Sequence, residues 1–267
     1  MGVVNVTPDS FSDGGRYLDP DAAVQHGLSL AAEGADILDV GGESTRPGAE
    51  PITEADEIAR VIPVVAGLVA RTPTPVSVDT TKAAVAAAAI DAGASVVNDI
   101  SAGRADPRML AVVGEAGAGF VAMHMQGEPR TMQHDPRYDD VVNDVGDFLV
   151  ERLEAARAAR IAPDALCVDP GIGFGKTAKH NLTLLAHLSE LVDRVAVPVL
   201  VGTSRKAFIG SILGGASPEA RDDGTLATVV WAIDQGASFV RVHAVRPAVD
   251  AVRLLSELRV IDAHAVA

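Results

Sequence analysis

The sequence predicts an α/β fold, a single (β/α)8 TIM barrel with long βα loops at its C-terminal face. Eight short apolar runs recur along the chain, at residues 2–6, 36–40, 76–79, 95–98, 120–124, 166–169, 198–202 and 239–243. Helical patterns separate these runs, for example over residues 21–32, 53–70, 82–91, 138–159, 182–191 and 225–234. This regular alternation of strand and helix is typical of the barrel. We assign the barrel to residues 1–260 and a C-terminal tail to residues 261–267.

Four junctions of the chain share one pattern, in which a helix ends at a glycine and a strand follows. The four glycines are Gly34, Gly93, Gly117 and Gly236. Glycine suits the left-handed residue just past a helix end, and the apolar run after it suits a strand that is buried on both faces. The junctions therefore support repeated helix–strand units.

A doubly wound open sheet is the alternative fold, and it would normally carry a nucleotide-binding fingerprint. The best candidate is the glycine-rich segment 171–177, which follows the apolar run 166–169. Lys176 breaks the spacing G-x-G-x-x-G, and only three residues separate Gly171 from Gly175, which breaks the phosphate-loop spacing. The segment is a glycine-rich loop of another kind.

Composition excludes several classes of function. The 267 residues carry a formal net charge of -14, which argues against binding to nucleic acid or to an anionic membrane. Cys167, the single cysteine, lies in an apolar run, so we interpret it as a buried strand thiol and expect no disulfide within the chain. We find no export signal and no apolar run near 18 residues, and we expect a cytoplasmic protein.

Three long connections follow predicted strands, at residues 7–20, 41–52 and 125–137. Long βα connections are often functional, and in a barrel they share the C-terminal face. The first begins with the polar segment 5–15, where Pro8 and the Gly14–Gly15 pair disfavour a helix. A solvated surface turn is the alternative interpretation of this segment.

Polar or basic residues close every predicted strand, at Asn5, Asp39, Asp79, Asn98, His124, Asp169, residues 202–206, Arg241 and His243. In a barrel these side chains converge on one mouth. The positive charges suit a phosphate or pyrophosphate, and they come from Arg46, Arg205, Lys206, Arg241 and His243. The acceptors and the amide suit a flat heterocycle with N–H donors, and they come from Asp79, Asn98 and Asp169.

A metal site built only from protein ligands has little support. The sequence has no H-E-x-x-H motif and no cysteine pair, and we interpret His180 and His187 as part of a solvated helix face. A magnesium ion carried with a pyrophosphate stays possible, because it needs only one or two protein oxygens.

The chain resembles the dihydropteroate synthase family, the pterin-binding barrels of the folate pathway that sulfonamides inhibit. The segments that carry the resemblance are 5–15, 41–49, 77–80, 98–100, 123–127, 169–176, 204–206 and 241–243. Each motif alone is weak, but eight motifs in order across the whole chain are specific.

The resemblance implies that 6-hydroxymethyl-7,8-dihydropterin diphosphate and 4-aminobenzoate give 7,8-dihydropteroate and pyrophosphate, with Mg²⁺, in a homodimer that binds no nucleic acid or membrane. The implied catalytic residues are Asp79, Asp13, Arg46 and Lys206. The implied pterin contacts are Asp79, Asn98, Met123, Asp169, Phe174, Gly202 and Lys206. The implied diphosphate contacts are Asn5, Arg241 and His243, with Asn5 also near the metal. The implied aminobenzoate contacts are Phe11, Thr45, Pro47, Phe174 and Lys206.

The chain departs from the family pattern at four places. Ala207 replaces a frequent serine at the aminobenzoate carboxylate, Ala244 replaces an aspartate and Ala102 replaces a frequent glycine. Relatives also carry residues before the first strand, so here either the start is trimmed or the bottom of the barrel closes in another way.

Three other functions compete with this interpretation. A methyltetrahydrofolate-dependent methyltransferase barrel would not need a diphosphate site, and a catalytically inactive pterin-binding relative would be expected to lose Asn5, Arg46 or His243. A sugar-phosphate isomerase would need a glutamate base with a positioned histidine, which the sequence does not offer.

Overall fold

The computed structural model describes residues 1–7, 19–45 and 48–265. Phe11, Asp13, Arg46 and Pro47, to which the resemblance gives roles, lie outside the described residues.

In the described part of the chain, eight parallel strands form the centre of the molecule. Their bounds are β1 Gly2–Asn5, β2 Leu38–Gly41, β3 Val76–Asp79, β4 Val96–Asp99, β5 Gly119–Met123, β6 Leu166–Asp169, β7 Leu200–Val201 and β8 Phe239–Val240. The first six strands pair in chain order, and β7 pairs with β8. Two parallel bridges join these sheets, one between Val168 and Val199 and one between Gly2 and Val242. The bridges close the ring, so the predicted barrel is confirmed and an open doubly wound sheet is wrong.

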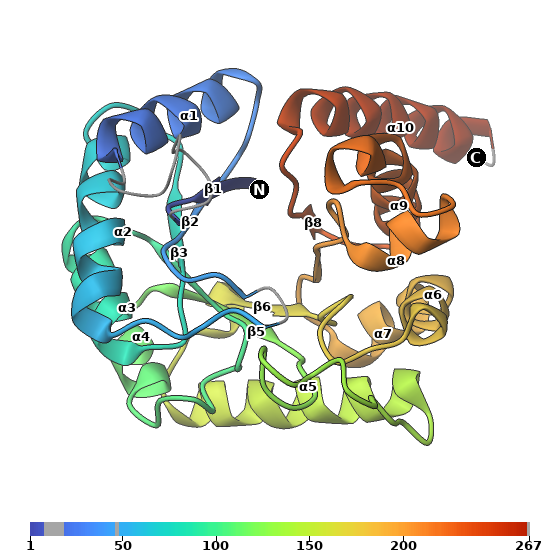
Figure 1. Cartoon of the computed structure of the whole chain (residues 1–267). Helices are drawn as coiled ribbons and strands as arrows, with labels where there is room; N and C mark the ends of the chain where they lie inside the picture. The colour runs from blue at the N-terminus through green and yellow to red at the C-terminus, as the bar shows by residue number, and fades with distance from the viewer. Residues whose placement is uncertain (8–18, 46–47, 266–267) are drawn as a thin grey trace.

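Helices surround the strands (Figure 1). Their bounds are α1 Pro20–Ala32, α2 Glu54–Val69, α3 Ala83–Asp91, α4 Met109–Ala116, α5 Val141–Ala158, α6 Ala178–Ala186, α7 Leu188–Val195, α8 Ala207–Ile212, α9 Asp222–Asp234 and α10 Val245–Ala265. Residues 261–265, which we had assigned to the tail, therefore continue the last helix. None of the described helices is long and apolar enough to cross a membrane.

The helix predicted over residues 182–191 is in fact two helices. Thr177 and His180 form a capping box, which starts α6 at Ala178. His187 ends α6 with φ -109° and ψ 25°, and α7 begins at the next residue. The apolar pattern continues through this break because both helices pack on the same side of the barrel, so periodicity alone could not reveal it.

The predicted helix–glycine–strand junctions are confirmed. Gly34, Gly93, Gly117 and Gly236 have φ values of 103°, 104°, 66° and 97°. A side chain is strained in this left-handed region, so glycine lets the chain turn sharply from each helix into the following strand. These short turns keep the strands in register.

The core is aliphatic and lies between the sheet and the helices. Val40 and Val78 are fully buried, and they alternate along their strands with Asp39 and Ser77. Because alternate residues of a strand point to opposite faces, the valines face the helices while Asp39 and Ser77 face the inside of the barrel. A smaller apolar cluster contains Ile100, Met123, Met125, Met132 and Phe174.

Candidate active site

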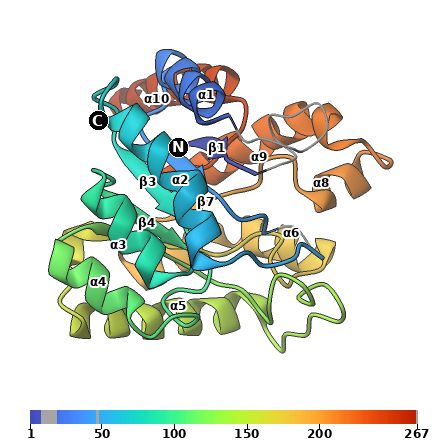
Figure 2. The same ribbon diagram turned by 60° about the vertical axis from the view of Figure 1, so that its left-hand side comes forward.

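The register of the sheet brings the predicted strand-end residues into one row. Asn5 lies opposite Gly41, Gly41 lies opposite Asp79, and Asp79 lies opposite Asn98 on the next strand. Further round the ring, Met123 lies opposite Asp169. In Figure 2 the connections that follow β2 and β5 extend toward the same end of the barrel, on the right of the view. These predicted strand-end residues therefore lie at neighbouring positions along one end of the sheet.

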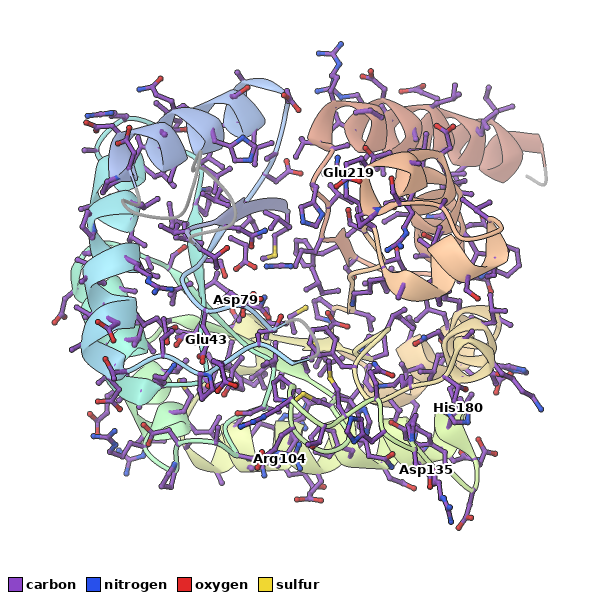
Figure 3. The ribbon with its side chains drawn as sticks, viewed as in Figure 1. Glu43, Asp79, Arg104, Asp135, His180 and Glu219 are labelled. Carbon is purple, nitrogen blue, oxygen red and sulfur yellow. The ribbon has the colours of Figure 1, made fainter. Side chains whose placement is uncertain are left out.

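Arg241 joins two carboxylates at this mouth. Its Nε donates to Asp39 Oδ2 at 2.6 Å, and its Nη2 donates to Asp79 Oδ2 at 2.8 Å. Asn98 Nδ2 donates to the same Asp39 oxygen at 3.1 Å. Figure 3 shows Asp79 inside the ring of helices. We call Asp39, Asp79 and Arg241 the barrel cluster.

The barrel cluster has unusual electrostatics. Burial raises the pKa of Asp79 to about 7, although Arg241 opposes this change, and the negative charges of Asp39, Glu57 and Asp99 add to it. Burial disfavours the charge of Arg241, but Asp39 and Asp79 hold the pKa of this guanidinium above its ordinary value. Two carboxylates therefore share one cation, and Asp79 is the group whose charge changes near neutral pH.

Asp169 and Lys206 form the opposite wall of the mouth. A side chain on Gly202 would begin 3.8 Å from Asp169 Oδ2 and 3.9 Å from Lys206 Nζ, so these groups border the same space. Burial raises the pKa of Asp169, with Lys206 opposing it. Burial lowers the pKa of Lys206 to about 8, with Asp169 opposing it. Lys206 Nζ also lies 4.6 Å from the centroid of the Phe174 ring.

The glycine-rich loop after β6 needs glycine because other backbone lies against it. A Cβ atom on Gly171 would lie 1.8 Å from the carbonyl oxygen of His124, and one on Gly175 would lie 2.4 Å from that of Gln126. Both glycines also have positive φ, at 67° and 63°. The loop therefore follows the β5–α5 connection closely, which brings Phe174 to the mouth.

Lys176, to which the sequence analysis gave no role in the site, is hydrogen-bonded to this loop. The side chain is buried, and its Nζ donates to the carbonyl oxygens of Gly171 at 2.9 Å and Phe174 at 3.1 Å. It also lies 2.8 Å from His124 Nδ1. Burial lowers the pKa of both Lys176 and His124, the latter to about 2, so the imidazole is neutral. His124 thus supplies no positive charge to the mouth.

Arg205 also does not add an unpaired charge, which corrects the sequence interpretation. Its guanidinium makes two bonds to Asp222 on α9, at 2.7 and 2.8 Å. Arg205 has a left-handed φ of 58°. In this conformation its side chain and that of Lys206 point in different directions. His243 remains near the mouth, where its Nδ1 lies 2.8 Å from Ser204 Oγ.

A second group of charges lies outside the barrel, and sequence reasoning missed it. Lys82 Nζ lies 2.5 Å from Glu43 Oε2 and 2.5 Å from Glu57 Oε2. We call these three residues the outer cluster. Glu43 Oε1 also accepts from the backbone N–H of Ile52, so Glu43 ties together the two ends of the β2–α2 connection. Figure 3 labels Glu43 on this connection.

The remaining predicted residues have the following positions. Asn5 and Thr45 are half-buried, at the end of β1 and in the β2–α2 connection. Within the described ranges, no three histidine, cysteine or acidic residues form a metal-binding group. Cys167 is half-buried. Its surroundings still raise the pKa of the thiol to about 12, chiefly through burial, so the group stays protonated at neutral pH.

His180 and His187, which we interpreted as part of a solvated helix face, both make contacts within the protein. His180 caps α6, and His187 is paired with Glu190 on the surface. Ala102 has φ 54°, a left-handed conformation that glycine adopts with less strain than alanine.

The fold agrees with comparisons to known proteins. A family model described as pterin binding enzyme matches residues 1–243. A dihydropteroate synthase from Mycobacterium leprae is 50% identical over 261 residues, which cover 96% of this chain and 91% of the relative. The chain is therefore a pterin-binding barrel protein.

Two solved structures extend this result. The Yersinia pestis dihydropteroate synthase in complex with a sulfonamide drug is 46% identical, with a TM-score of 0.91, covering 97% of this chain and 93% of that chain. The Xanthomonas albilineans enzyme in complex with 7,8-dihydropteroate is 46% identical, with a TM-score of 0.87, covering 97% and 92%. The chain belongs to the dihydropteroate synthase family.

Proposed function

We propose that this protein is a dihydropteroate synthase, a transferase of folate biosynthesis. It condenses 6-hydroxymethyl-7,8-dihydropterin diphosphate with 4-aminobenzoate and gives 7,8-dihydropteroate and pyrophosphate. The observation that carries the proposal is the mouth itself, where Arg241 and Lys206 lie beside the carboxylates of Asp79 and Asp169. The relative that binds 7,8-dihydropteroate supports the identity of the product.

The carboxylates form the pterin half of the mouth. A reduced pterin presents ring N–H groups and an exocyclic amine, which require acceptors. Asp79 and Asp169 provide carboxylate oxygens, and Asn98 provides an amide whose Nδ2 is already held by Asp39. Met123, Phe174 and Gly202 lie around these groups, where they would contact the flat faces and edge of the ring.

The basic groups form the diphosphate half. Arg241 has five donors in a planar fork, which suits phosphate oxygens, and His243 follows it by two residues. In an SN1-like route the C–O bond breaks before the amine attacks, and a pterin cation forms beside a departing pyrophosphate. Asp79 stabilises the cation while Arg241 stabilises the anion, so the adjacent opposite charges match both products of bond cleavage.

Magnesium would bind in the diphosphate half of the mouth together with the pyrophosphate, rather than through protein ligands alone. Hard cations prefer oxygen ligands, and the described residues offer the Asn5 amide oxygen at the end of β1. We propose that Asn5 contributes one ligand oxygen. The ion would neutralise charge on the pyrophosphate.

The aminobenzoate would lie between the pterin methylene carbon that carries the diphosphate and the surface of the protein. Lys206 Nζ lies over the Phe174 ring at this edge. We propose that Thr45, in the β2–α2 connection, contacts the substrate here. We propose that Phe11 and Pro47 complete the aminobenzoate site, and that Asp13 and Arg46 order the two connections that carry them.

One assay tests the proposed reaction. Pyrophosphate release is measured with the pterin diphosphate alone, with 4-aminobenzoate alone and with both. The proposal predicts that rapid release requires both substrates and that 7,8-dihydropteroate forms in equal amount. Release that proceeds equally without the amine would indicate a hydrolase. Methyl transfer from methyltetrahydrofolate, or pterin binding without turnover, would favour the alternative pterin barrels.

We further propose a homodimer that uses the outer faces of α9 and α10. Leu254, Leu258 and Ile261 follow one another at helical spacing and are 66%, 56% and 68% exposed. Trp231 on the neighbouring α9 is 46% exposed. Contiguous exposed apolar residues of this kind mark association surfaces. Light scattering should show a dimer for the wild type and a monomer for Leu258→Glu. The control Val69→Glu, on the distant α2, should stay dimeric.

The cytoplasmic location expected from the sequence stays a prediction. Cell fractionation with an antibody to the protein would test it.

A further inference from the structure

We infer that Asp39 is the positioning residue of the mouth, which holds the guanidinium of Arg241 and the amide of Asn98 in their binding orientations. The inference rests on the proposed function, because it assigns Asp39 a role toward the diphosphate and pterin sites. Asp39 itself lies below the mouth and does not line it.

The geometry of Asp39 differs from that of its neighbours. The residue is fully buried on β2, and its Oδ2 accepts from two side chains on different strands, Arg241 and Asn98. The bond from Arg241 Nε is 2.6 Å long, which is short for a charge-assisted bond. One oxygen therefore fixes one group from the diphosphate half and one from the pterin half.

The fork shape of arginine explains why this anchor matters. Arg241 uses Nε toward Asp39 and Nη2 toward Asp79, so its remaining guanidinium edge can meet a phosphate while Nε stays fixed. Nη2 can also leave Asp79 when an anion binds, because the bond to Asp39 still fixes the group. Asp79 would then offer its full charge to the pterin. A lysine lacks this planar fork, so it cannot keep one edge fixed on Asp39 while another edge binds the phosphate.

The surroundings of Asp39 supply a matched control. Among the described residues, neither Asp39 Oδ1 nor Ser77 Oγ has a hydrogen-bond partner, and both atoms are buried. The two residues lie opposite one another in register on β2 and β3. Ser77→Ala removes a buried polar atom from the same layer without touching Arg241. The affinity of this variant therefore shows the effect of altering the buried layer while the hydrogen bond between Asp39 and Arg241 is kept.

A double-mutant cycle measures the coupling between Asp39 and Arg241. Calorimetry gives the dissociation constant for pyrophosphate with Mg²⁺ in the wild type, Asp39→Asn, Arg241→Ala and the double variant. We expect Asp39→Asn to weaken binding about tenfold or more, the usual effect of losing a hydrogen bond to a charged group. In the Arg241→Ala background the same change should have almost no effect, because the group that Asp39 positions is gone. Ser77→Ala should keep wild-type affinity.

Two further measurements separate positioning from a purely structural role. Arg241→Lys retains the charge but loses the fork, so it should bind pyrophosphate about as poorly as Arg241→Ala. Asp39→Asn should also move the acid limb of the kcat/KM profile to lower pH. The charged groups facing Asp79 are Arg241, Asp39, Glu57, Asp99 and Lys206, and Asp39 is one of those that raise its pKa.

Defined results would overturn the inference. Wild-type affinity in Asp39→Asn, or an equal loss with and without Arg241, would show that Asp39 does not act through Arg241. If Asp39→Asn does not fold, wild-type affinity in Arg241→Lys would do the same, because charge alone would then suffice. A wild-type protein that fails to bind pyrophosphate would overturn the proposed function together with this inference.

Discussion

The barrel cluster and the outer cluster contain the same charges in different places. In each, two carboxylates share one cation: Asp39 and Asp79 share Arg241, while Glu43 and Glu57 share Lys82. The two cations are similarly sheltered, with side-chain exposures of 22% for Arg241 and 19% for Lys82. Their surroundings differ, because the first cluster opens at strand ends into the mouth and the second joins a loop to a helix.

The difference shows in which group is perturbed. Burial raises the pKa of Asp79 to about 7, so one carboxylate of the barrel cluster is poised to change its charge. In the outer cluster burial opposes the charge of Lys82, but hydrogen bonds to Glu43 and Glu57 keep its pKa above the ordinary value. The outer cluster is therefore a fixed ion pair network, whereas the barrel cluster can exchange partners. Identical charges thus serve stability in one place and chemistry in the other.

Asp79→Asn should have the largest effect on function. A carboxylate 4 Å from a developing cation contributes roughly 4 kcal/mol at an effective dielectric constant near 20, or about three decades in rate. We expect turnover to fall by up to this amount, with a smaller loss in pterin affinity. Steady-state kinetics and calorimetry with the pterin give the two quantities.

The control for this prediction is Glu57→Gln, which alters a fully buried carboxylate of the outer cluster, whereas the Asp79 side chain is 15% exposed. Its turnover per folded molecule should change only a few-fold. Equal losses of turnover and pterin affinity in Asp79→Asn would contradict the assigned role.

Lys82→Met should affect stability more than activity. It leaves Glu57, which is fully buried, without its cation. Removing one partner of a buried pair costs about 3 kcal/mol or more. We expect the midpoint of urea unfolding to fall accordingly, while the folded variant keeps most of its turnover. The double variant Lys82→Met with Glu57→Leu should recover part of the loss, and a double variant as unstable as Lys82→Met alone would argue against the buried charge as the cause.

The pH profile of kcat/KM should be bell-shaped, with its optimum between about pH 7 and 8. As the pH falls below about 7, Asp79 gains a proton and loses the charge that stabilises the cation. As the pH rises above about 8, Lys206 loses its proton and its positive charge. Each limb should approach a tenfold change per pH unit. Lys206→Arg should abolish the alkaline limb, because arginine keeps its proton. An unchanged alkaline limb in this variant would remove Lys206 as its origin.

The sequence predicts the barrel and most of the mouth because both depend on local signals. A strand end that carries Asp79, Asn98 or Arg241 marks the C-terminal face directly, and Gly34 or Gly93 marks a helix end. Pairings between distant elements leave no such signal. Lys82 and Glu57 are joined only through the packing of α2, and Lys176 Nζ contacts His124 Nδ1 although the two residues are 52 positions apart in the sequence.

Backbone conformation limits the prediction in a similar way. Arg205 belongs to the basic segment that the sequence directs to the mouth, but its left-handed φ directs the side chain to Asp222. Nothing in the residue type reveals that turn, because left-handed arginines are uncommon. The roles given to Phe11, Asp13, Arg46 and Pro47 stay predictions.

The central claim is that the mouth stabilises a pterin cation and a departing pyrophosphate before the amine attacks. The most direct test measures kcat with a series of ring-substituted 4-aminobenzoates at saturating concentrations. If C–O cleavage comes first, kcat should hardly change as the basicity of the amine changes. A kcat that rises steeply with amine basicity would show that the amine attacks during bond cleavage, and it would contradict this account.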